Sequence, residues 1–408
     1  MTRILTPFLH TVRDGGEVLG YLAVDSTVRG RSLGGLRIAP DVTAEEIAEL
    51  ARAMTLKYGL AGLPQGGAKA GVLGDPEASA DERRERLAAF GRAIAGLLRS
   101  RVYQPDTDMG TRADDIRGML SAAGAEASRR AFRTDRSGFY TALTVMAGAR
   151  EALRRRGIGL KGATVAIEGF GAVGGALASV LNLAGARVIA VSTSRGAIHD
   201  AEGLDVPRLV ALTAALGSRA VLEYREAEAI EAKDLTELQV DLLSPCARPW
   251  SIRESRAAGV RAKVISPGAN APITPAAEGI LAERGVLVVP DFVANSGGVI
   301  GGTMAFAAVG ERRIETFLVD RMGSWIDRLL ERAERTGVTP REVATPLARA
   351  RFEEVRRRAE RPGPAGRAVG LAVELHRRGL LPRPLVGALA ASWFERSLAP
   401  APDQGGPL

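Results

Sequence analysis

The feature that most constrains the fold of this chain is a short apolar stretch that runs directly into a glycine-rich turn. Residues 163–168, ATVAIE, predict a β-strand, and an Ala- and Leu-rich helix follows the turn. A G-x-G-x-x-G pattern between a strand and a helix is typical of dinucleotide binding, with the pyrophosphate at the helix N-terminus. A purely structural glycine turn is the alternative. The turn consists of Gly169, Phe170, Gly171, Ala172, Val173 and Gly174.

The residues around this turn predict alternating helices and strands. A helix is expected at about 138–155, and further strands at 187–192, 240–243, 262–265 and 285–289. Strands separated by helices over such a length favour an α/β fold with a doubly wound, Rossmann-like parallel sheet.

The second strand of this region ends in a sequence that leaves the choice of dinucleotide open. Residues 191–195 read VSTSR, without the acidic residue that binds the ribose 2′-hydroxyl of NAD. Arg195 is instead suited to a 2′-phosphate, so NAD and NADP both stay candidates. We count Thr193 and Arg195 among the candidate cofactor-binding residues.

The strongest candidate for chemistry lies in residues 32–74. Five of the 55 Lys and Arg residues are lysines, and two of these, Lys57 and Lys69, lie twelve residues apart. Arginine stays protonated, whereas a buried lysine loses its proton readily or binds a carboxylate. Two ammonium groups facing one cavity would repel each other and lower the pKa of one of them. Chance placement is the alternative.

The two lysines are expected on different kinds of structure. Residues 43–60 predict a helix that begins with a capping box of Thr43 and Glu46, which puts Lys57 on a rigid element. Lys69 follows the sequence PQGG, whose glycines predict a loop that approaches a ligand closely.

Two further segments carry polar residues at predicted strand ends. A strand beginning near Val102 ends in Asp106 and Asp108, before a helix that Thr111 is expected to cap. A carboxylate beside two lysines can keep one charged and relay protons for the other, and Asp106 competes with Asp108 for this role. A turn or capping aspartate is the alternative. Residues 290–298, PDFVANSGG, predict a strand end and a polar turn, where α/β sheets bind ligands.

Composition argues against several other classes of protein. The net charge of +8 is spread along the chain and aromatic residues make up 4%, which disfavours a nucleic-acid partner. We find neither an apolar run long enough to span a membrane nor a signal peptide. A single cysteine, Cys246, favours the cytoplasm, and three separated histidines disfavour a zinc site. We therefore expect a cytoplasmic protein without a metal, membrane or nucleic-acid partner.

Together the motifs resemble those of the glutamate/leucine/phenylalanine/valine dehydrogenase family. The similar segments read, in order, GGLR…PDVT, MTLKYGLAGLPQGGAKAGV, DTDMGT, GFGAVG, SPGANAPITP and PDFVANSGG, and span roughly residues 16–360. The resemblance implies two domains with the active site in the cleft between them. It also implies NAD(P)-dependent, reversible oxidative deamination of an L-amino acid to a 2-oxo acid and ammonia.

The resemblance implies a role for each candidate residue. Lys57 would bind the substrate α-carboxylate, Lys69 would activate water for attack on the imino intermediate, and Asp108 would shuttle protons at nitrogen. Asn270 would join residues 169–174 on the coenzyme side. The remaining candidates for substrate binding are Leu33, Gly34, Asn295 and Gly302.

Two positions indicate an apolar substrate side chain. Glutamate-specific members of the family carry a lysine just before the GG of GGLR, where this chain has Leu33. They also carry a serine a few residues after the Asn-x-Gly-Gly turn, where this chain reads IGGT at residues 300–303. Since an unpaired buried carboxylate is costly, a branched-chain or aromatic amino acid is preferred, and Gly301 and Gly302 would leave room for it.

We expect the chain to divide into four segments. Residues 1–135 form the substrate, catalytic and oligomerisation domain, and residues 136–310 form the NAD(P)-binding domain. Residues 311–360 form helices that return to the first domain, and residues 361–408 add a helical tail with a disordered end. In that tail Leu371, Leu375, Leu380 and Leu381 are expected to form a packing face.

The resemblance also implies a homo-oligomer, either a hexamer or an octamer. Two alternatives to an enzyme for apolar amino acids stay open. One is a glutamate dehydrogenase that binds the side-chain carboxylate through another residue. The other is a catalytically weakened paralogue that senses an amino acid or regulates an active partner.

Overall fold

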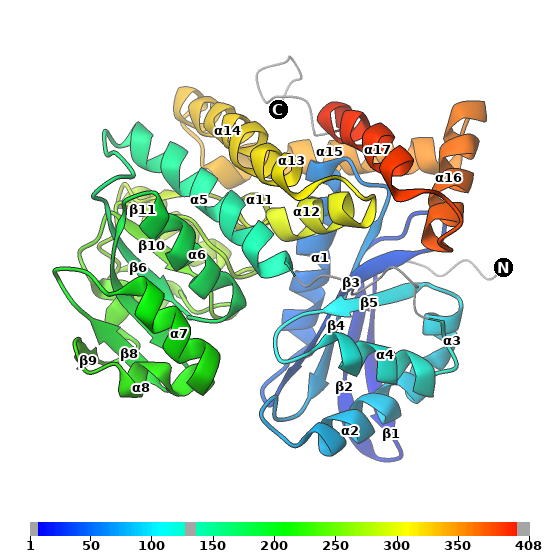
Figure 1. Ribbon diagram of the computed structural model, residues 1–408, viewed down its shortest axis with the longest axis horizontal. Coiled ribbons are helices and arrows are strands. Elements are labelled where there is room, and N and C mark those ends of the chain that lie inside the picture. The colour runs from blue at the N-terminus through cyan, green and yellow to red at the C-terminus, as the bar shows by residue number, and fades with distance from the viewer. Residues whose placement is uncertain (1–6, 127–135, 398–408) are drawn as a thin grey trace. The chain divides into compact units, whose positions relative to one another are not determined.

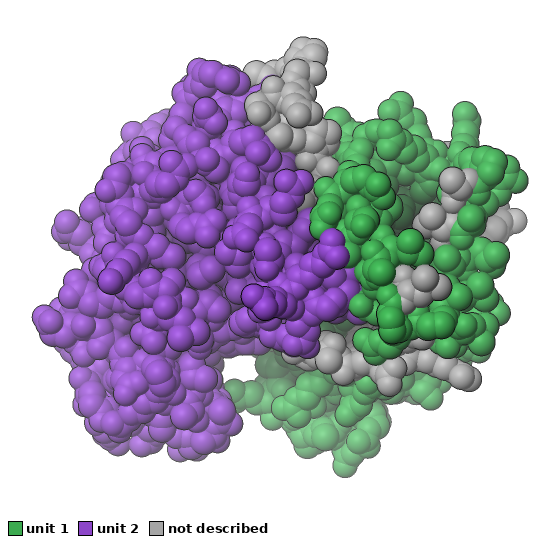
Figure 2. Space-filling view, turned by 45° about the horizontal axis from the view of Figure 1, so that its top comes forward, with its two compact units in different colours: residues 1–134, 306–308, 348–399 green, residues 135–305, 309–347, 400–408 purple. Residues whose placement is uncertain are grey.

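The described chain consists of two compact units, whose helices and strands are labelled in Figure 1 and which Figure 2 colours separately. The structure is a computed structural model and describes residues 7–126 and 136–397. Unit 1 comprises the described residues among 1–134, 306–308 and 348–399, and unit 2 those among 135–305 and 309–347. The predicted disordered end, residues 399–408, lies outside the described residues.

Unit 1 is built on a five-stranded mixed sheet. Its strands are β1 (Phe8–Asp14), β2 (Glu17–Val24), β3 (Ser32–Ala39), β4 (Gly66–Leu73) and β5 (Tyr103–Thr107), arranged in the order β1-β2-β4-β3-β5. β3 pairs in parallel with β4 and β5, whereas β2 is antiparallel to β1 and β4. The edge strand β1 was not among the predicted strands.

Helices cover both faces of this sheet (Figure 1). One face packs against α1 because β4 carries glycines there: a Cβ at Gly67 would lie 2.4 Å from the backbone nitrogen of Thr55 on α1. On the other face Phe90 and Met119 join Leu36 in the apolar core. The helices of this part are α1 (Ala44–Ala61), α2 (Ala80–Ala93), α3 (Ala95–Arg99) and α4 (Ala113–Ala122).

Helix α1 begins where the sequence predicts. Thr43 is the N-cap, and its hydroxyl accepts a hydrogen bond of 3.2 Å from the backbone nitrogen of Glu46. The predicted capping box is only half formed, because the carboxylate of Glu46 binds Arg37 on β3. The helix ends at Gly62, whose left-handed φ of 65° favours glycine.

Unit 2 is built on a seven-stranded sheet in the order β12-β11-β10-β6-β7-β8-β9. The strands from β12 to β7 run parallel, and β8 and β9 continue the sheet antiparallel. The predicted Rossmann-like α/β sheet is confirmed, with β8 and β9 as an unpredicted extension. The strands are β6 (Thr164–Glu168), β7 (Arg187–Thr193), β8 (Gly196–His199), β9 (Glu228–Ile230), β10 (Leu242–Pro245), β11 (Val264–Ile265) and β12 (Leu287–Val288).

Helices connect these strands and line both sides of the unit 2 sheet (Figure 1). The helices from α5 to α12 are α5 (Ser137–Arg155), α6 (Ala172–Leu183), α7 (Val206–Leu216), α8 (Ala220–Glu223), α9 (Glu254–Ala257), α10 (Pro275–Glu283), α11 (Asp291–Ala294) and α12 (Gly297–Phe306), of which α5 precedes the sheet and α11 and α12 follow it. The segment PDFVANSGG, predicted to be a strand end and turn, therefore contains α11 and the start of α12.

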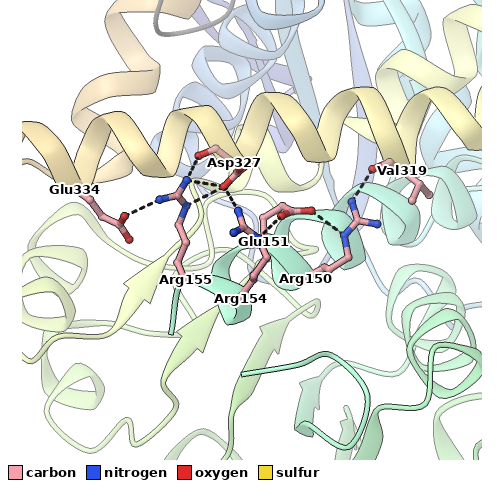
Figure 3. A network of polar contacts seen from close by, with 7 residues as sticks. All are labelled: Arg150, Glu151, Arg154, Arg155, Val319, Asp327 and Glu334. Atoms are coloured by element: carbon pink, nitrogen blue, oxygen red, sulfur yellow. Dashed lines mark hydrogen bonds and ion pairs between the residues drawn. The ribbon is translucent and has the colours of Figure 1, made fainter. Parts of the chain in front are cut away.

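The next helices pack within unit 2. A short helix α13 (Glu311–Thr316) and a π-helical turn lead into α14 (Met322–Thr336), which lies along α5. Figure 3 shows the ion pairs between them: Asp327 on α14 lies 2.6 Å from guanidinium nitrogens of both Arg154 and Arg155. Residues 311–360 were all expected to return to the first domain, whereas residues 309–347 group with unit 2.

The described part of the chain ends in three helices. These are α15 (Pro340–Glu360), α16 (Pro364–Arg377) and α17 (Arg383–Ser397), and α16 and α17 belong to unit 1. His376 on α16 is buried and hydrogen-bonded through Nε2 to the carbonyl oxygen of Phe306, 2.7 Å away. The predicted packing face is wrong for Leu371 and Leu380, which are 62% and 66% exposed. In the described ranges, no helix is long and apolar enough to cross a membrane.

Candidate active site

Lys69 lies inside strand β4, whereas the sequence predicted it on a loop. The glycines that indicated a loop instead allow α1 to pack against the strand, since a Cβ at Gly71 would lie 2.7 Å from Cδ1 of Ile47 on α1. Lys69 is 2% exposed. Its ammonium group is therefore carried by a rigid, buried element.

Lys69, Asp108 and Arg37 form an ion network within unit 1. Nζ of Lys69 lies 2.6 Å from Oδ2 of Asp108. The same oxygen accepts a hydrogen bond of 2.9 Å from Nε of Arg37, and Nη2 of Arg37 forms an ion pair with it at 2.9 Å. Arg37 also forms an ion pair with Glu46 at the start of α1. Sequence reasoning missed Arg37 and Glu46, although Arg37 is the arginine of the GGLR motif.

The network shifts the pKa values of its members in opposite directions. Burial lowers the pKa of Lys69, the attraction of Asp108 opposes this, and the charge of Arg37 lowers it further, so the net pKa is below the ordinary value. Burial raises the pKa of Asp108, but Arg37 and Lys69 outweigh burial and hold it well below its usual range. A cation that helps to lower the pKa of Lys69 is thus Arg37, and the predicted contribution of Lys57 stays a prediction.

Asp108 is held in place by its backbone. It follows β5 directly, and its nitrogen donates a hydrogen bond of 2.9 Å to the hydroxyl of Thr111. That hydroxyl donates in turn to the carbonyl oxygen of Leu36 on β3, 2.8 Å away. Thr111 was predicted to cap α4, but the N-cap is Arg112 and Thr111 instead ties Asp108 to the sheet. The competing Asp106 is exposed, and Asp108 is the carboxylate that contacts Lys69.

A glycine on β3 makes room for the network. A Cβ at Gly35 would lie 2.8 Å from Cβ of Asp108 and 3.1 Å from Nζ of Lys69. The neighbouring Gly34 faces the opposite way, and a Cβ there would lie 1.6 Å from the carbonyl oxygen of Ala68. Close packing of two strands therefore explains the glycine at position 34, and its predicted contact with substrate stays a prediction.

Leu33 and Lys57 both lie on elements next to the network. Side chains alternate along a strand, so Leu33 shares the face of β3 that carries Gly35 and Arg37. Lys57 is buried on α1, and the adjacent Tyr58 donates a hydrogen bond of 3.2 Å to the carbonyl oxygen of Leu33. The predicted substrate-binding residues Leu33 and Lys57 are thus placed on β3 and on the helix that packs over it.

The glycine turn of unit 2 fits the pyrophosphate of a dinucleotide. Gly169 has a φ of 92°, and a Cβ there would lie 2.7 Å from the backbone nitrogen of Ala247, just after β10. The strand order reverses between β6 and β10, where α/β sheets bind ligands. Gly171 is the N-cap of α6, and among the described residues no side chain caps this helix. The N–H groups of its first turn are therefore oriented to receive a phosphate.

Gly174 allows a direct test of this turn. A Cβ at Gly174 would lie 1.9 Å from the carbonyl oxygen of Gly169, so Gly174→Ala must displace the turn or the helix. We expect NADH binding, measured by fluorescence titration, to weaken by roughly tenfold or more, which is about 1.4 kcal/mol. Gly175→Ala is the matched control, because its Cβ would meet only the Phe170 ring at 3.7 Å. Unchanged affinity in Gly174→Ala would show that the turn does not hold the coenzyme.

The end of β7 supports the turn through a residue that sequence reasoning missed. The hydroxyl of Ser192 accepts a hydrogen bond of 3.1 Å from the nitrogen of Gly169, and the carbonyl oxygen of Ser192 accepts one of 2.7 Å from Phe170. Thr193 donates to the carbonyl oxygen of Ser218 and accepts from the nitrogen of Arg195, so its hydroxyl is held in the turn between β7 and β8. Coenzyme contacts of Thr193 and Arg195 stay predictions.

The structure brings Asn270 and Asn295 together in unit 2. Nδ2 of Asn295 lies 3.1 Å from Oδ1 of Asn270 and donates to the carbonyl oxygen of Ala269, 2.8 Å away. Oδ1 of Asn295 is buried and has no hydrogen-bond partner among the described residues. An unpaired buried acceptor fits a ligand that carries an amide N–H, as nicotinamide does.

The space around Gly301 and Gly302 differs from the expectation. A Cβ at Gly301 would lie 2.6 Å from the ring of Tyr140, so Tyr140 fills the room that was predicted for a large substrate. At Gly302 an added Cβ would meet nothing within 4 Å, so this position is open. In the part of the chain that the structure describes, no group of His, Cys, Asp and Glu side chains could hold a metal ion.

Comparison with known families decides what kind of protein carries this site. The model of the Glutamate/Leucine/Phenylalanine/Valine dehydrogenase family matches residues 135–363, and the model of the Glu/Leu/Phe/Val dehydrogenase dimerisation domain matches residues 3–123. The chain belongs to this family. The resemblance in its sequence is confirmed, and the protein is an amino-acid dehydrogenase that uses NAD or NADP.

Individual relatives agree with this assignment. The chain is 36% identical over 315 residues to the NAD-specific glutamate dehydrogenase of Staphylococcus aureus (strain COL), covering 73% of this chain and 75% of the relative. It is 37% identical over 317 residues to the glutamate dehydrogenase of Thermotoga maritima, with the same coverage.

Solved structures show the same fold. The hetero-hexameric glutamate dehydrogenase of Thermus thermophilus in its Leu-bound form matches with a TM-score of 0.72 and 28% identity, covering 86% of this chain and 89% of that one. The L-tryptophan dehydrogenase of Nostoc punctiforme matches with a TM-score of 0.56 and 23% identity, covering 85% of this chain and 96% of that one, and supports the fold alone.

Proposed function

We propose that this dehydrogenase catalyses the reversible oxidative deamination of an L-amino acid with an apolar side chain, giving a 2-oxo acid and ammonia. The observation that carries the proposal is the ion pair of buried Lys69 with half-buried Asp108, 2.6 Å apart, on the sheet face that also carries Leu33. A lysine with a lowered pKa beside an ionised carboxylate supplies both a base and a proton carrier.

The division of roles follows from the charges. Lys57 binds the substrate α-carboxylate, and NAD or NADP, held by residues 169–174, supplies the hydride acceptor. Neutral Lys69 takes a proton from the water that attacks the imino carbon, and Asp108 carries protons to and from the substrate nitrogen. Arg37 keeps Asp108 ionised and oriented through its hydrogen bond from Nε and its ion pair through Nη2.

The side chain of the substrate is inferred from Leu33. This position provides no charge for a substrate side-chain carboxylate, and desolvating an unpaired carboxylate costs several kcal/mol. Glutamate is the second candidate substrate because two relatives that are 36% and 37% identical are named glutamate dehydrogenases.

Replacing Leu33 by lysine tests the substrate proposal. We expect Leu33→Lys to raise the ratio of kcat/KM for glutamate to kcat/KM for leucine by roughly tenfold or more, because a charge-assisted hydrogen bond contributes about 1.5–3 kcal/mol. Leu33→Met is the control, since it conserves volume and adds no charge. A ratio that does not change in Leu33→Lys would contradict the assignment of Leu33 to the substrate side-chain pocket.

We also propose that the chain forms a homo-oligomer through unit 1 and binds the coenzyme through unit 2. Support comes from the dimerisation-domain model, which matches residues 3–123, and from the glycine turn of unit 2. The Thermus thermophilus neighbour is described as hetero-hexameric, so light scattering of the pure chain has to establish whether it assembles alone.

A further inference from the structure

A basic hollow lies in unit 2 at the edge of the sheet where its parallel strands begin. It has a volume of about 450 Å³, within the usual range for ligand pockets. Its walls come from the end of α5, from the residues just before β11 and from those just before β12. Four cationic side chains line it: Arg156, Arg261, Lys263 and Arg284. We call this the amino-edge pocket.

The positive charge of the amino-edge pocket is largely uncompensated. Nζ of Lys263 lies 2.9 Å from Oδ1 of Asp241. For Arg156, Arg261 and Arg284, by contrast, the described residues provide no ion pair with a carboxylate. Arg156 differs in this from the two arginines directly before it, because Arg154 and Arg155 both form ion pairs with Asp327 (Figure 3). Three guanidinium groups are therefore left to bind an external anion.

Two of these arginines are oriented by the backbone. Nη2 of Arg156 donates to the carbonyl oxygen of Gly285, 2.9 Å away, and Nη2 of Arg284 donates to that of Val260, 3.1 Å away. Each guanidinium has five N–H groups, so each keeps donors for a ligand while its position is restrained. Restrained guanidinium forks suit phosphate oxygens, which they bind in bidentate fashion.

The amino-edge pocket also has an apolar side. Ile158, which is half-buried, and Val286, which is 9% exposed, present apolar surface to it. An anion that carries several charges and an attached apolar or planar group would use both kinds of wall. The terminal phosphates of a nucleotide, with its base against Ile158 and Val286, have this combination.

We propose that the amino-edge pocket binds a polyphosphate anion, such as the phosphate chain of a nucleoside triphosphate. The pocket is separate from the coenzyme turn, because residues 169–174 follow the carboxyl end of β6 whereas the pocket precedes β11 and β12. In a parallel sheet these are opposite edges, so both sites can be filled together. The inference does not depend on which amino acid the enzyme uses.

Isothermal titration calorimetry of the full chain tests this site. ATP and, separately, inorganic triphosphate are titrated into protein held with saturating NADH, so that the coenzyme site is already occupied. We expect about one ATP per chain, and a loss of affinity of roughly tenfold or more in Arg156→Ala/Arg261→Ala, because hydrogen bonds to charged groups are removed. Equal affinities for inorganic triphosphate and ATP would show that the phosphates alone are recognised. A higher affinity for ATP would show that the apolar wall also contributes to binding.

A matched control separates a site from diffuse charge. Arg312→Ala/Arg335→Ala removes the same charge from exposed positions on α13 and α14 of the same unit, and ATP affinity should not change. Arg261→Glu alone is a second variant, since Arg261 is exposed, and NADH affinity and melting temperature report whether each variant is folded. The proposal is overturned if neither anion binds, if both double variants lose affinity equally, or if NADH abolishes ATP binding.

Discussion

Lys69→Ala is expected to abolish turnover while leaving coenzyme binding nearly intact. Lys69 lies in unit 1 and carries a lowered pKa, whereas the glycine turn that we propose binds the coenzyme lies in unit 2. A general base contributes roughly 10²–10⁴-fold to a rate, so kcat should fall by at least that factor. Initial rates at saturating substrate, together with NADH titrations of the same preparation, measure the two effects.

The variant Lys69→Arg separates the charge of Lys69 from its proton transfer. Arginine preserves a cation next to Asp108 but cannot release its proton in a protein. We expect Lys69→Arg to be as inactive as Lys69→Ala. Substantial activity in Lys69→Arg would show that the position supplies only a positive charge, and loss of NADH binding in Lys69→Ala would contradict the separation of roles between the units.

Asp108→Asn is expected to lower kcat by roughly 10²–10⁴-fold with little change in coenzyme affinity, because an amide cannot carry protons to the substrate nitrogen. Asp106→Asn is the matched control: Asp106 is an exposed carboxylate two residues earlier, on β5. Its kcat should stay close to that of the unchanged protein. Equal losses in both variants would point to a general effect of charge on this strand.

Asp108→Asn should also shift the pH profile of the residual activity. The carboxylate of Asp108 raises the pKa of Lys69, so its removal lowers that pKa. Activity that needs neutral Lys69 is gained as pH rises through this pKa, and the acid limb of kcat/KM should therefore move to lower pH. An acid limb that stays in place or moves to higher pH would contradict Lys69 as the base.

The sequence predicts this site well where a local pattern decides it. Thr43 caps α1 as expected, and the turn at residues 169–174 joins a strand to a helix as the dinucleotide pattern requires. Lys69 was misplaced because glycines usually indicate a loop. Gly67 and Gly71 are needed instead where α1 packs on β4, and such contact between distant segments leaves no local signal.

Other features of the site depend on pairings between distant residues. Glu46 has the spacing of a capping-box residue, but its carboxylate reaches Arg37 on β3, nine positions earlier in the chain. Thr111 is a residue type that commonly caps helices. Its hydroxyl instead donates a hydrogen bond to the carbonyl oxygen of Leu36. The strands β1 and β9 were missed because they are edge strands and largely exposed, which weakens the apolar alternation that reveals a strand. The strand β8, which lies between β7 and β9, was missed because it is only four residues long.

The most direct test of the proposed function is a spectrophotometric assay for reduced nicotinamide. Leucine, valine, phenylalanine, tryptophan and glutamate are each supplied with NAD and with NADP to the purified chain. We predict clear turnover with at least one apolar amino acid and a lower kcat/KM for glutamate. Turnover with glutamate alone would contradict the inference from Leu33. A folded chain that binds NADH but turns over none of these substrates would contradict the catalytic role of Lys69 and Asp108 and favour a regulatory paralogue.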